Sequence, residues 1–156
     1  KIANDLRLMN SGPNGGLGEV VLPKVQQGST IMPGKVNPVM AEMTMQCAIK
    51  VIANDTAITM AAAHGEFELN AFMPLIADSL LESLELMTSS VQLFREKCIE
   101  PLQVNEKNCR KYLEASSAFA ASYVPALGYD QVSRIIRDCS PEEAVKELKK
   151  CLEQKD

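Results

Sequence analysis

The hydrophobic positions of this chain predict two long helices flanked by shorter elements. Residues 39 to about 63 are rich in Met, Ala and Ile, with few charges and neither Gly nor Pro. Such a run predicts a long helix, and Pro38 suits its first turn because the missing N–H needs no partner there. Apolar residues fall on more than one side of this helix, so we expect it to be buried on several sides, as in a bundle.

After a break at Gly65, a second long helix is predicted from about Asn70 or Pro74 to Cys98. One side carries an apolar stripe at helical spacing, and charged residues mark the side that we expect to face solvent. The stripe consists of Leu80, Leu84, Met87, Val91 and Phe94, and the charged side of Glu82, Glu85, Arg95 and Lys97. Two long helices with a short connection predict an antiparallel hairpin.

Shorter elements are predicted at both ends of the chain. Residues 1–10 have the pattern of the last turns of a helix, the Gly- and Pro-rich residues 12–18 an irregular stretch, and residues 20–22 a short extended segment. Three short helices are predicted near the other end. Their ranges are 106–116 with Asn105 as N-cap, about 130–138 after Gly128, and 141 to about 152 with Ser140 and Glu143 forming a capping box.

These elements predict an all-α fold. We expect residues 1–99 to form part of a long-helix bundle and residues 100–156 to form a small helical C-terminal domain. The 156 residues are 46% hydrophobic, which is enough for a core.

Charge and composition exclude some classes of partner. The net charge of −4, the scarcity of aromatic residues and the lack of a dense basic cluster argue against nucleic-acid binding. No run of eighteen apolar residues occurs, so no membrane span is expected. We expect a cytoplasmic protein.

The cysteines and the single histidine offer little chemistry. Five cysteines, an odd number without Cys-x-x-Cys spacing, argue against a disulfide framework or a zinc site and favour a reducing compartment. His64 precedes Gly65 at the end of the first long helix, where it is better explained as a C-terminal cation than as an acid or base. A Ser-His-Asp triad is therefore poorly supported.

Candidate chemistry is concentrated in the loop formed by residues 28–38, Gly-Ser-Thr-Ile-Met-Pro-Gly-Lys-Val-Asn-Pro. Ser29 and Thr30 supply hydroxyls, Lys35 a positive charge, and Asn37 both a donor and an acceptor. Such groups between glycines suggest an active-site lid, although an ordinary surface turn would account for the composition equally well.

Residues 28–38 resemble the signature of the aspartase/fumarase superfamily, Gly-Ser-Ser-x-Met-Pro-x-Lys-x-Asn-Pro, at ten of eleven positions. Thr30 stands where the family usually has a second serine. The resemblance covers nearly the whole chain, through Lys1–Arg7, Asn54-Asp55-Thr56, Glu68-Leu69-Asn70 and Gly128-Tyr129-Asp130. It implies a homotetramer with a long central bundle, no metal or cofactor, and active sites each assembled from three regions of three subunits.

The resemblance also assigns roles within the loop. It implies that Ser29 is the general base, that Thr30, Lys35 and Asn37 hold the carboxylates of a small dicarboxylate substrate, and that Gly28 and Gly34 are hinges. A serine hydroxyl is a poor base at neutral pH, so nearby donors and positive charge must activate it.

Two reactions fit the resemblance. Segments such as Lys1–Leu8 and Asn37-Pro38-Val39 favour reversible anti elimination of ammonia from L-aspartate to give fumarate, with Ser29 abstracting the Cβ proton. Leu17-Gly18-Glu19 and Glu66–Asn70 favour a fumarate hydratase, which interconverts malate and fumarate. A non-catalytic helical assembly module is a third interpretation.

Chains of this family are much longer on the N-terminal side. We therefore expect a C-terminal fragment with a truncated last domain, which is not active alone. The exposed apolar faces of residues 39–98 should make it associate.

Overall fold

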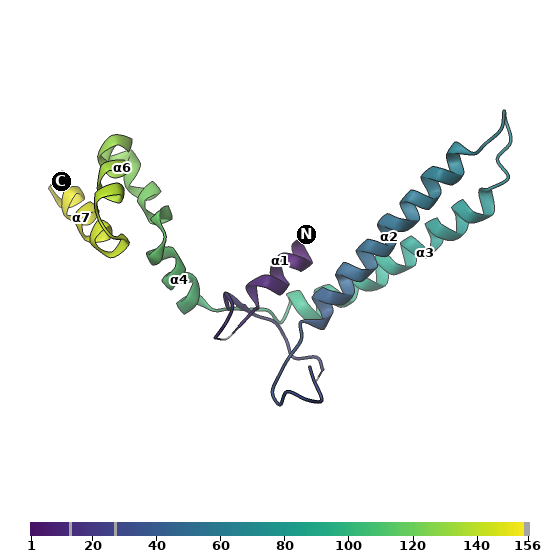
Figure 1. Cartoon of the computed structure of the whole chain (residues 1–156), viewed down its shortest axis with the longest axis horizontal. Coiled ribbons are helices and arrows are strands. Elements are labelled where there is room, and N and C mark those ends of the chain that lie inside the picture. The colour runs from purple at the N-terminus through teal and green to yellow at the C-terminus, as the bar shows by residue number, and fades with distance from the viewer. Residues whose placement is uncertain (13, 27, 155–156) are drawn as a thin grey trace. The chain divides into compact units, whose positions relative to one another are not determined.

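The computed structural model describes residues 1–12, 14–26 and 28–154. Pro13, part of the predicted irregular stretch, and the final two residues lie outside the described residues. The described chain is mainly helical, which confirms the predicted all-α class, and it divides into two compact units, Lys1–Val104 and Asn105–Asp156 (Figure 1). Within the described ranges no helix is both long and apolar enough to cross a membrane.

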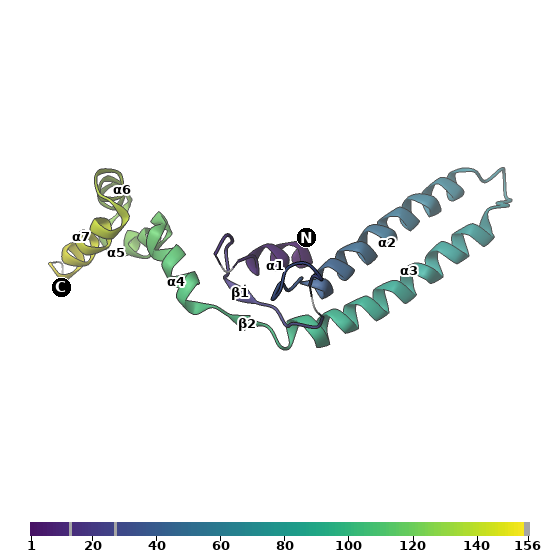
Figure 2. The ribbon, with the colours of Figure 1, turned by 60° about the horizontal axis from the view of Figure 1, so that its bottom comes forward.

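An antiparallel hairpin of two long helices dominates the first unit. Helix α2 (Val39–Ala63) and helix α3 (Met73–Phe94) lie side by side in both ribbon views (Figure 1 and Figure 2). A π-helical turn, η1 (Arg95–Ile99), continues α3 and ends before Pro101. The predicted hairpin is thus confirmed, with the bounds of α2 at the predicted residues.

The side of α3 that is buried is not the predicted one. Its buried residues are Ser79, Ser83 and Ser90. Four residues of the predicted apolar stripe face outward instead: Leu80, Leu84, Met87 and Val91 have exposed fractions of 49, 53, 50 and 59%. The fifth, Phe94, is half-buried and packs against the core at the base of the unit. The physical reason is close approach, because small side chains let two helices pack tightly where leucines would hold them apart.

Burial of α2 on several sides, as predicted, does not occur within this unit. Met43 and Cys47 are half-buried, whereas Ile49 and Ile52 are 65 and 66% exposed. One face of α2 therefore packs within the hairpin and another faces outward.

A polar network around Asn54 joins the two helices. Asn54 is only 5% exposed, and the two N–H groups of its Nδ2 are shared among three acceptors: the Ser79 carbonyl at 3.2 Å, Ser83 Oγ at 3.1 Å and Glu82 Oε2 at 2.8 Å. Lys50 Nζ lies 3.0 Å from the same Glu82 oxygen. The hydrogen bonds from Asn54 and then Lys50 lower the pKa of Glu82. Because a buried amide must keep its partners, this network fixes the axial register of the hairpin.

The tip of the hairpin is tied back to both helices. Helix α2 ends at Ala63, as predicted, with His64 as its C-cap, and α3 begins after Phe72. Between them Asn70 Nδ2 donates to the Ala61 carbonyl at 3.0 Å, while Asn70 Oδ1 accepts from the Phe72 N–H at 2.8 Å. Phe67 adopts a φ of +51° and is fully exposed.

The base of the first unit connects distant parts of the chain. Helix α1 (Ile2–Met9) leads to strand β1 (Val20–Val21), which pairs antiparallel with strand β2 (Gln103–Val104). The predicted N-terminal helix and extended segment are confirmed; the partner strand was not predicted. Val20, Leu22 and Cys98 form a small core here, and burial raises the pKa of the Cys98 thiol.

The second unit consists of short helices around its own core. The elements are α4 (Glu106–Ala115), a 3-10 segment η2 (Ser117–Tyr123), α5 (Val124–Leu127), α6 (Tyr129–Asp138) and α7 (Pro141–Glu153). Ala120, Leu127, Val132 and Leu148 form the core. The three predicted helices are confirmed to within about two residues at each end.

Both predicted caps of this unit are present. The Asn105 side chain accepts from the Asn108 N–H at 3.3 Å, at the start of α4. At the start of α7, Ser140 and Glu143 form the reciprocal capping box. Hydrogen bonds from the Ser140 side chain and then its backbone N–H lower the pKa of Glu143.

Removing the buried amide should destabilise the hairpin. We expect Asn54→Ala to lower the free energy of unfolding by about 1–3 kcal/mol, because the acceptors that Asn54 serves lose a buried donor. Far-UV circular dichroism during urea unfolding measures this loss. Asn4→Ala, at an exposed position of α1, is the control and should have little effect. An Asn54→Ala protein as stable as the control would show that the network contributes nothing.

The capping box should make the second unit sensitive to acid. Because the pKa of Glu143 is lower in the folded state than its ordinary value of 4.5, its contribution is complete above that value. The contribution is lost as the pH falls through the folded pKa. The difference in unfolding free energy between wild type and Glu143→Ala should therefore be largest near neutral pH and shrink in acid.

Tyrosine fluorescence isolates this unit, since the chain has no tryptophan and its three tyrosines are Tyr112, Tyr123 and Tyr129. Glu142→Ala is the control, because no hydrogen bond of the capping box involves that side chain. A Glu143→Ala effect that is independent of pH would contradict the assignment.

Candidate functional site

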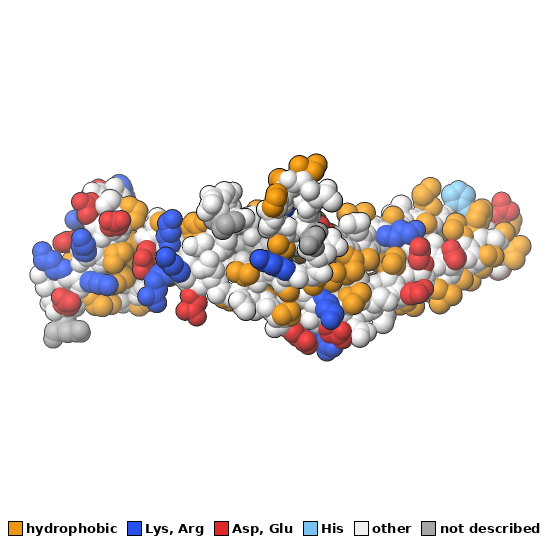
Figure 3. Space-filling model, turned by 90° about the horizontal axis from the view of Figure 1, so that it is seen from below, with side chains coloured by type: hydrophobic (Ala, Val, Ile, Leu, Met, Phe, Trp, Pro, Cys, Tyr) orange, Lys and Arg blue, Asp and Glu red, His pale blue; other side chains and the backbone are white. Residues whose placement is uncertain are grey.

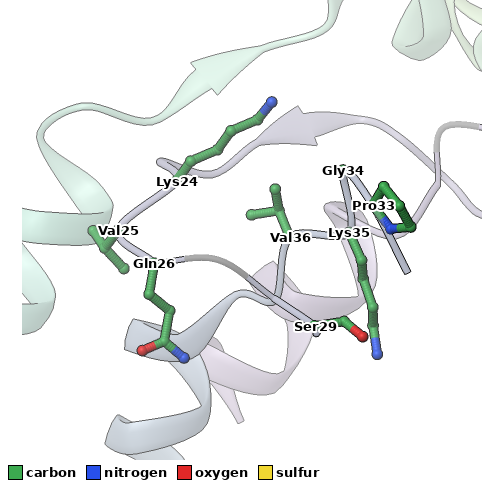
Figure 4. A pocket seen from close by; sticks show the side chains of 8 residues that line it. All are labelled: Lys24, Val25, Gln26, Ser29, Pro33, Gly34, Lys35 and Val36. Atoms are coloured by element: carbon green, nitrogen blue, oxygen red, sulfur yellow. The ribbon is translucent and has the colours of Figure 1, made fainter. Parts of the chain in front are cut away.

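The predicted loop 28–38 runs directly into α2, whose first residue is Val39. Beside it lies an open pocket of about 660 Å³ (Figure 4). The pocket is lined by Lys24, Val25, Gln26, Ser29, Pro33, Gly34, Lys35 and Val36. The structure thus places three of the predicted site residues, Ser29, Gly34 and Lys35, on the wall of one pocket.

Ser29 carries two backbone donors on its hydroxyl oxygen. Its Oγ accepts from the N–H groups of Ile31 and Met32, each at 3.1 Å. Serine forms such local bonds in many turns, so they also serve to shape the loop. Their chemical effect is nevertheless specific: two N–H donors stabilise an oxygen more strongly when it carries negative charge. Ser29 is half-buried, and its hydroxyl oxygen is held by these two donors at the wall of the pocket.

Lys35 supplies positive charge on the same side. Its side chain is exposed and, in the view of Figure 4, extends toward the Ser29 hydroxyl, whereas the Lys24 side chain points away from both. Thr30, also exposed, follows Ser29 in the chain but does not line the pocket. Ser29 and Lys35 thus line the same pocket, and Lys24 lines it as well.

Asn37 lies at the neck of the loop, where Gly28 meets residues 35–37, and is not among the residues that line the pocket. Its Nδ2 donates to the Gly28 carbonyl at 3.0 Å. The Gly28 N–H in turn donates to the Lys35 carbonyl at 2.9 Å. These two hydrogen bonds connect the beginning of the loop to its end.

The two predicted hinge glycines each have a structural role in this conformation. A Cβ on Gly28 would lie 2.4 Å from the Lys35 carbonyl oxygen, so only glycine allows this close approach. Gly34 has a φ of +80° in a turn closed by the Lys35 N–H donating to the Met32 carbonyl at 3.2 Å. With Pro33 before Gly34, this is a type II turn. A hinge role for either glycine stays a prediction.

Sequence reasoning missed the groups that act through the backbone. The donors to Ser29 belong to Ile31, a variable position of the motif, and to Met32, whose side chain carries no polar group. Val25 and Gln26, which line the pocket, precede the motif and gave no signal. Within the described part of the chain, no three His, Cys, Asp or Glu side chains gather as a metal site would require.

Comparisons with known proteins identify relatives for this arrangement. The sequence model of a family described as "Lyase" matches residues 1–53. Aspartate ammonia-lyase of Bacillus subtilis is 46% identical over 88% of this chain and 29% of the relative. Fumarate hydratase class II of Brucella suis is 44% identical over 88% of this chain and 30% of the relative.

A solved structure is similar along nearly the whole chain. The class II fumarase of Schistosoma mansoni superimposes with a TM-score of 0.83 at 37% identity, over 95% of this chain and 32% of that one. The chain thus spans about a third of the length of the relatives it matches. The loop, the long helical hairpin and these similarities together lead to one conclusion: the chain belongs to the aspartase/fumarase superfamily.

Proposed function

We propose that the protein containing this chain is a lyase that reversibly eliminates ammonia from L-aspartate to give fumarate, with Ser29 as the general base. The observation that carries the proposal is the pair of backbone N–H groups, from Ile31 and Met32, that converge on Ser29 Oγ. They favour the alkoxide, which is the form of serine that can take a proton from carbon. Lys35, on the wall of the same pocket, adds a positive field.

The remaining loop residues have roles in binding the substrate. Removing the Cβ proton of aspartate puts a second negative charge on the adjacent carboxylate, and fixed donors must stabilise that charge. The Thr30 hydroxyl is proposed to hold this carboxylate, and Lys35 and Asn37 to hold the other. Closure of the loop over the substrate would exclude water from the charged intermediate.

Fumarate hydratase is the second candidate. The relatives that support it are as similar as those that support the ammonia-lyase, at 44 and 46% identity. Both reactions start with the same proton abstraction and differ in the leaving group. Ser29 would be the base in either case.

We further propose that the site is completed by other copies of the protein in a homotetramer. Hydrophobic side chains cover much of the visible face of the hairpin, at the end marked by the histidine (Figure 3). Ile52, Leu81 and Val91 are 66, 65 and 59% exposed. Such an area on a single chain favours association with other chains.

Loss of the Ser29 hydroxyl should abolish turnover. We expect Ser29→Ala to lower kcat by about 10²–10⁴-fold, the usual contribution of a general base. The assay follows the absorbance of fumarate formed from L-aspartate and, separately, from L-malate. Ser122→Ala, which removes an exposed hydroxyl that donates to the Phe119 carbonyl within η2, is the matched control.

The two substrates separate the two candidate reactions. Fumarate from L-aspartate alone supports the ammonia-lyase, and fumarate from L-malate alone supports the hydratase. Wild-type activity in the Ser29→Ala protein would rule out its role as base, whichever substrate is turned over.

A charge on the outer face of the hairpin should weaken assembly. We expect Leu81→Lys to lower the molar mass measured by light scattering, because a lysine at an apolar contact must be desolvated. Ser89→Lys, at an exposed position of the same helix, adds the same charge at a position that is already polar. An unchanged mass for Leu81→Lys would show that this face is not an interface.

A further inference from the structure

Two hydrogen bonds join the beginning and the end of the loop formed by residues 28–38. Gly28 uses both of its backbone polar groups across the neck: its N–H donates to the Lys35 carbonyl at 2.9 Å, and its carbonyl accepts from Asn37 Nδ2 at 3.0 Å. We propose that Gly28 and Asn37 form a clamp that orients Ser29, with Asn37 acting as a positioning residue through the Gly28 carbonyl.

The covalent geometry of the chain explains how the clamp reaches Ser29. The Gly28 carbonyl and the Ser29 N–H belong to the same peptide group, which is planar and rigid. Holding the carbonyl with the Asn37 amide therefore fixes the direction in which the chain enters Ser29. The Ile31 and Met32 N–H groups in turn hold the side-chain oxygen.

Glycine is required on the other side of the clamp. Adding a Cβ at residue 28 would place it 2.4 Å from the Lys35 oxygen and 2.9 Å from the Val36 Cα. Both neighbours are backbone atoms, which cannot move aside without opening the neck. The residue type at position 28 thus serves a close approach of two chain segments in addition to any flexibility.

The clamp makes residues 28–37 one unit. The type II turn at Pro33 and Gly34 closes the far end of the loop in the same way that Gly28 and Asn37 close the near end. Any closing movement would then carry Ser29 and Lys35 together, with their relative placement kept. The Asn37 amide has a second N–H, which we assign to a substrate carboxylate; this part of the inference rests on the proposed function.

Hydrogen–deuterium exchange without substrate tests the clamp directly. The probe is the mass of a peptide that covers residues 28–37, in the protein that contains this chain. We expect Gly28→Ala and Asn37→Asp each to raise its exchange rate about tenfold, the effect of losing about one net hydrogen bond. Asn37→Asp keeps the size of the side chain but replaces the donor with an acceptor that faces the Gly28 carbonyl.

Lys35→Met is the matched control for this measurement. It removes the charge proposed to bind substrate but leaves the Lys35 backbone carbonyl and N–H in place. In the Lys35→Met protein, the peptide that covers residues 28–37 should exchange at the wild-type rate. Wild-type exchange in both Gly28→Ala and Asn37→Asp would overturn the clamp.

Kinetics distinguish positioning from substrate binding. Gly28→Ala should lower kcat about tenfold or more with KM for the substrate nearly unchanged, because Gly28 has no side chain to bind it. Lys35→Met should raise KM and also lower kcat, because Lys35 is proposed both to bind the substrate and to favour the Ser29 alkoxide. If the wild-type protein turns over neither L-aspartate nor L-malate, the proposed function fails while the exchange result still decides the clamp. Raised exchange with unchanged kcat in Gly28→Ala would refute the link from the clamp to Ser29.

Discussion

The close contact between α2 and α3, held by the Asn54 amide, is the constraint on which the first unit depends. The α3 side chains that face Asn54, Ser79 and Ser83, are small, and small side chains at a contact let two helices approach closely. Because serines occupy the face of α3 that contacts α2, its leucines and methionines lie on the outer face. The packing that holds the hairpin together therefore also leaves it with an apolar outer surface. Loop 28–38 runs directly into α2. The register that Asn54 sets between α2 and α3 therefore also determines the position of the helix from which the candidate site extends.

Local signals in the sequence predicted most of the fold. The bounds of α2 and α7 follow from Pro38, from His64 before Gly65, and from the Ser140 capping box, all of which act over one helical turn. The inner face of α3 could not be predicted, because serines and leucines both repeat at helical spacing and only the partner helix decides between them. The pairing of β1 with β2 was missed for a related reason: it joins residues far apart in the chain.

The site was only partly predictable from the sequence. The motif identified Ser29 and Lys35, and the structure places both on one pocket. The groups that act on Ser29 are backbone N–H donors, which every residue but proline carries, so the sequence holds no trace of them. Gly28 suggested a hinge because glycine is flexible, whereas its close contact with Lys35 depends on how the loop folds back.

The strand pair at the base of the hairpin has a consequence for the continuity of the chain. Val20 pairs with Val104, so the segments that enter and leave the hairpin are held together independently of the connection at its tip. The exposed tip around Phe67 could then be cut, or could receive an inserted peptide, and the two helices would remain associated. This makes residues 66–69 a natural place to split the first unit into two complementing pieces.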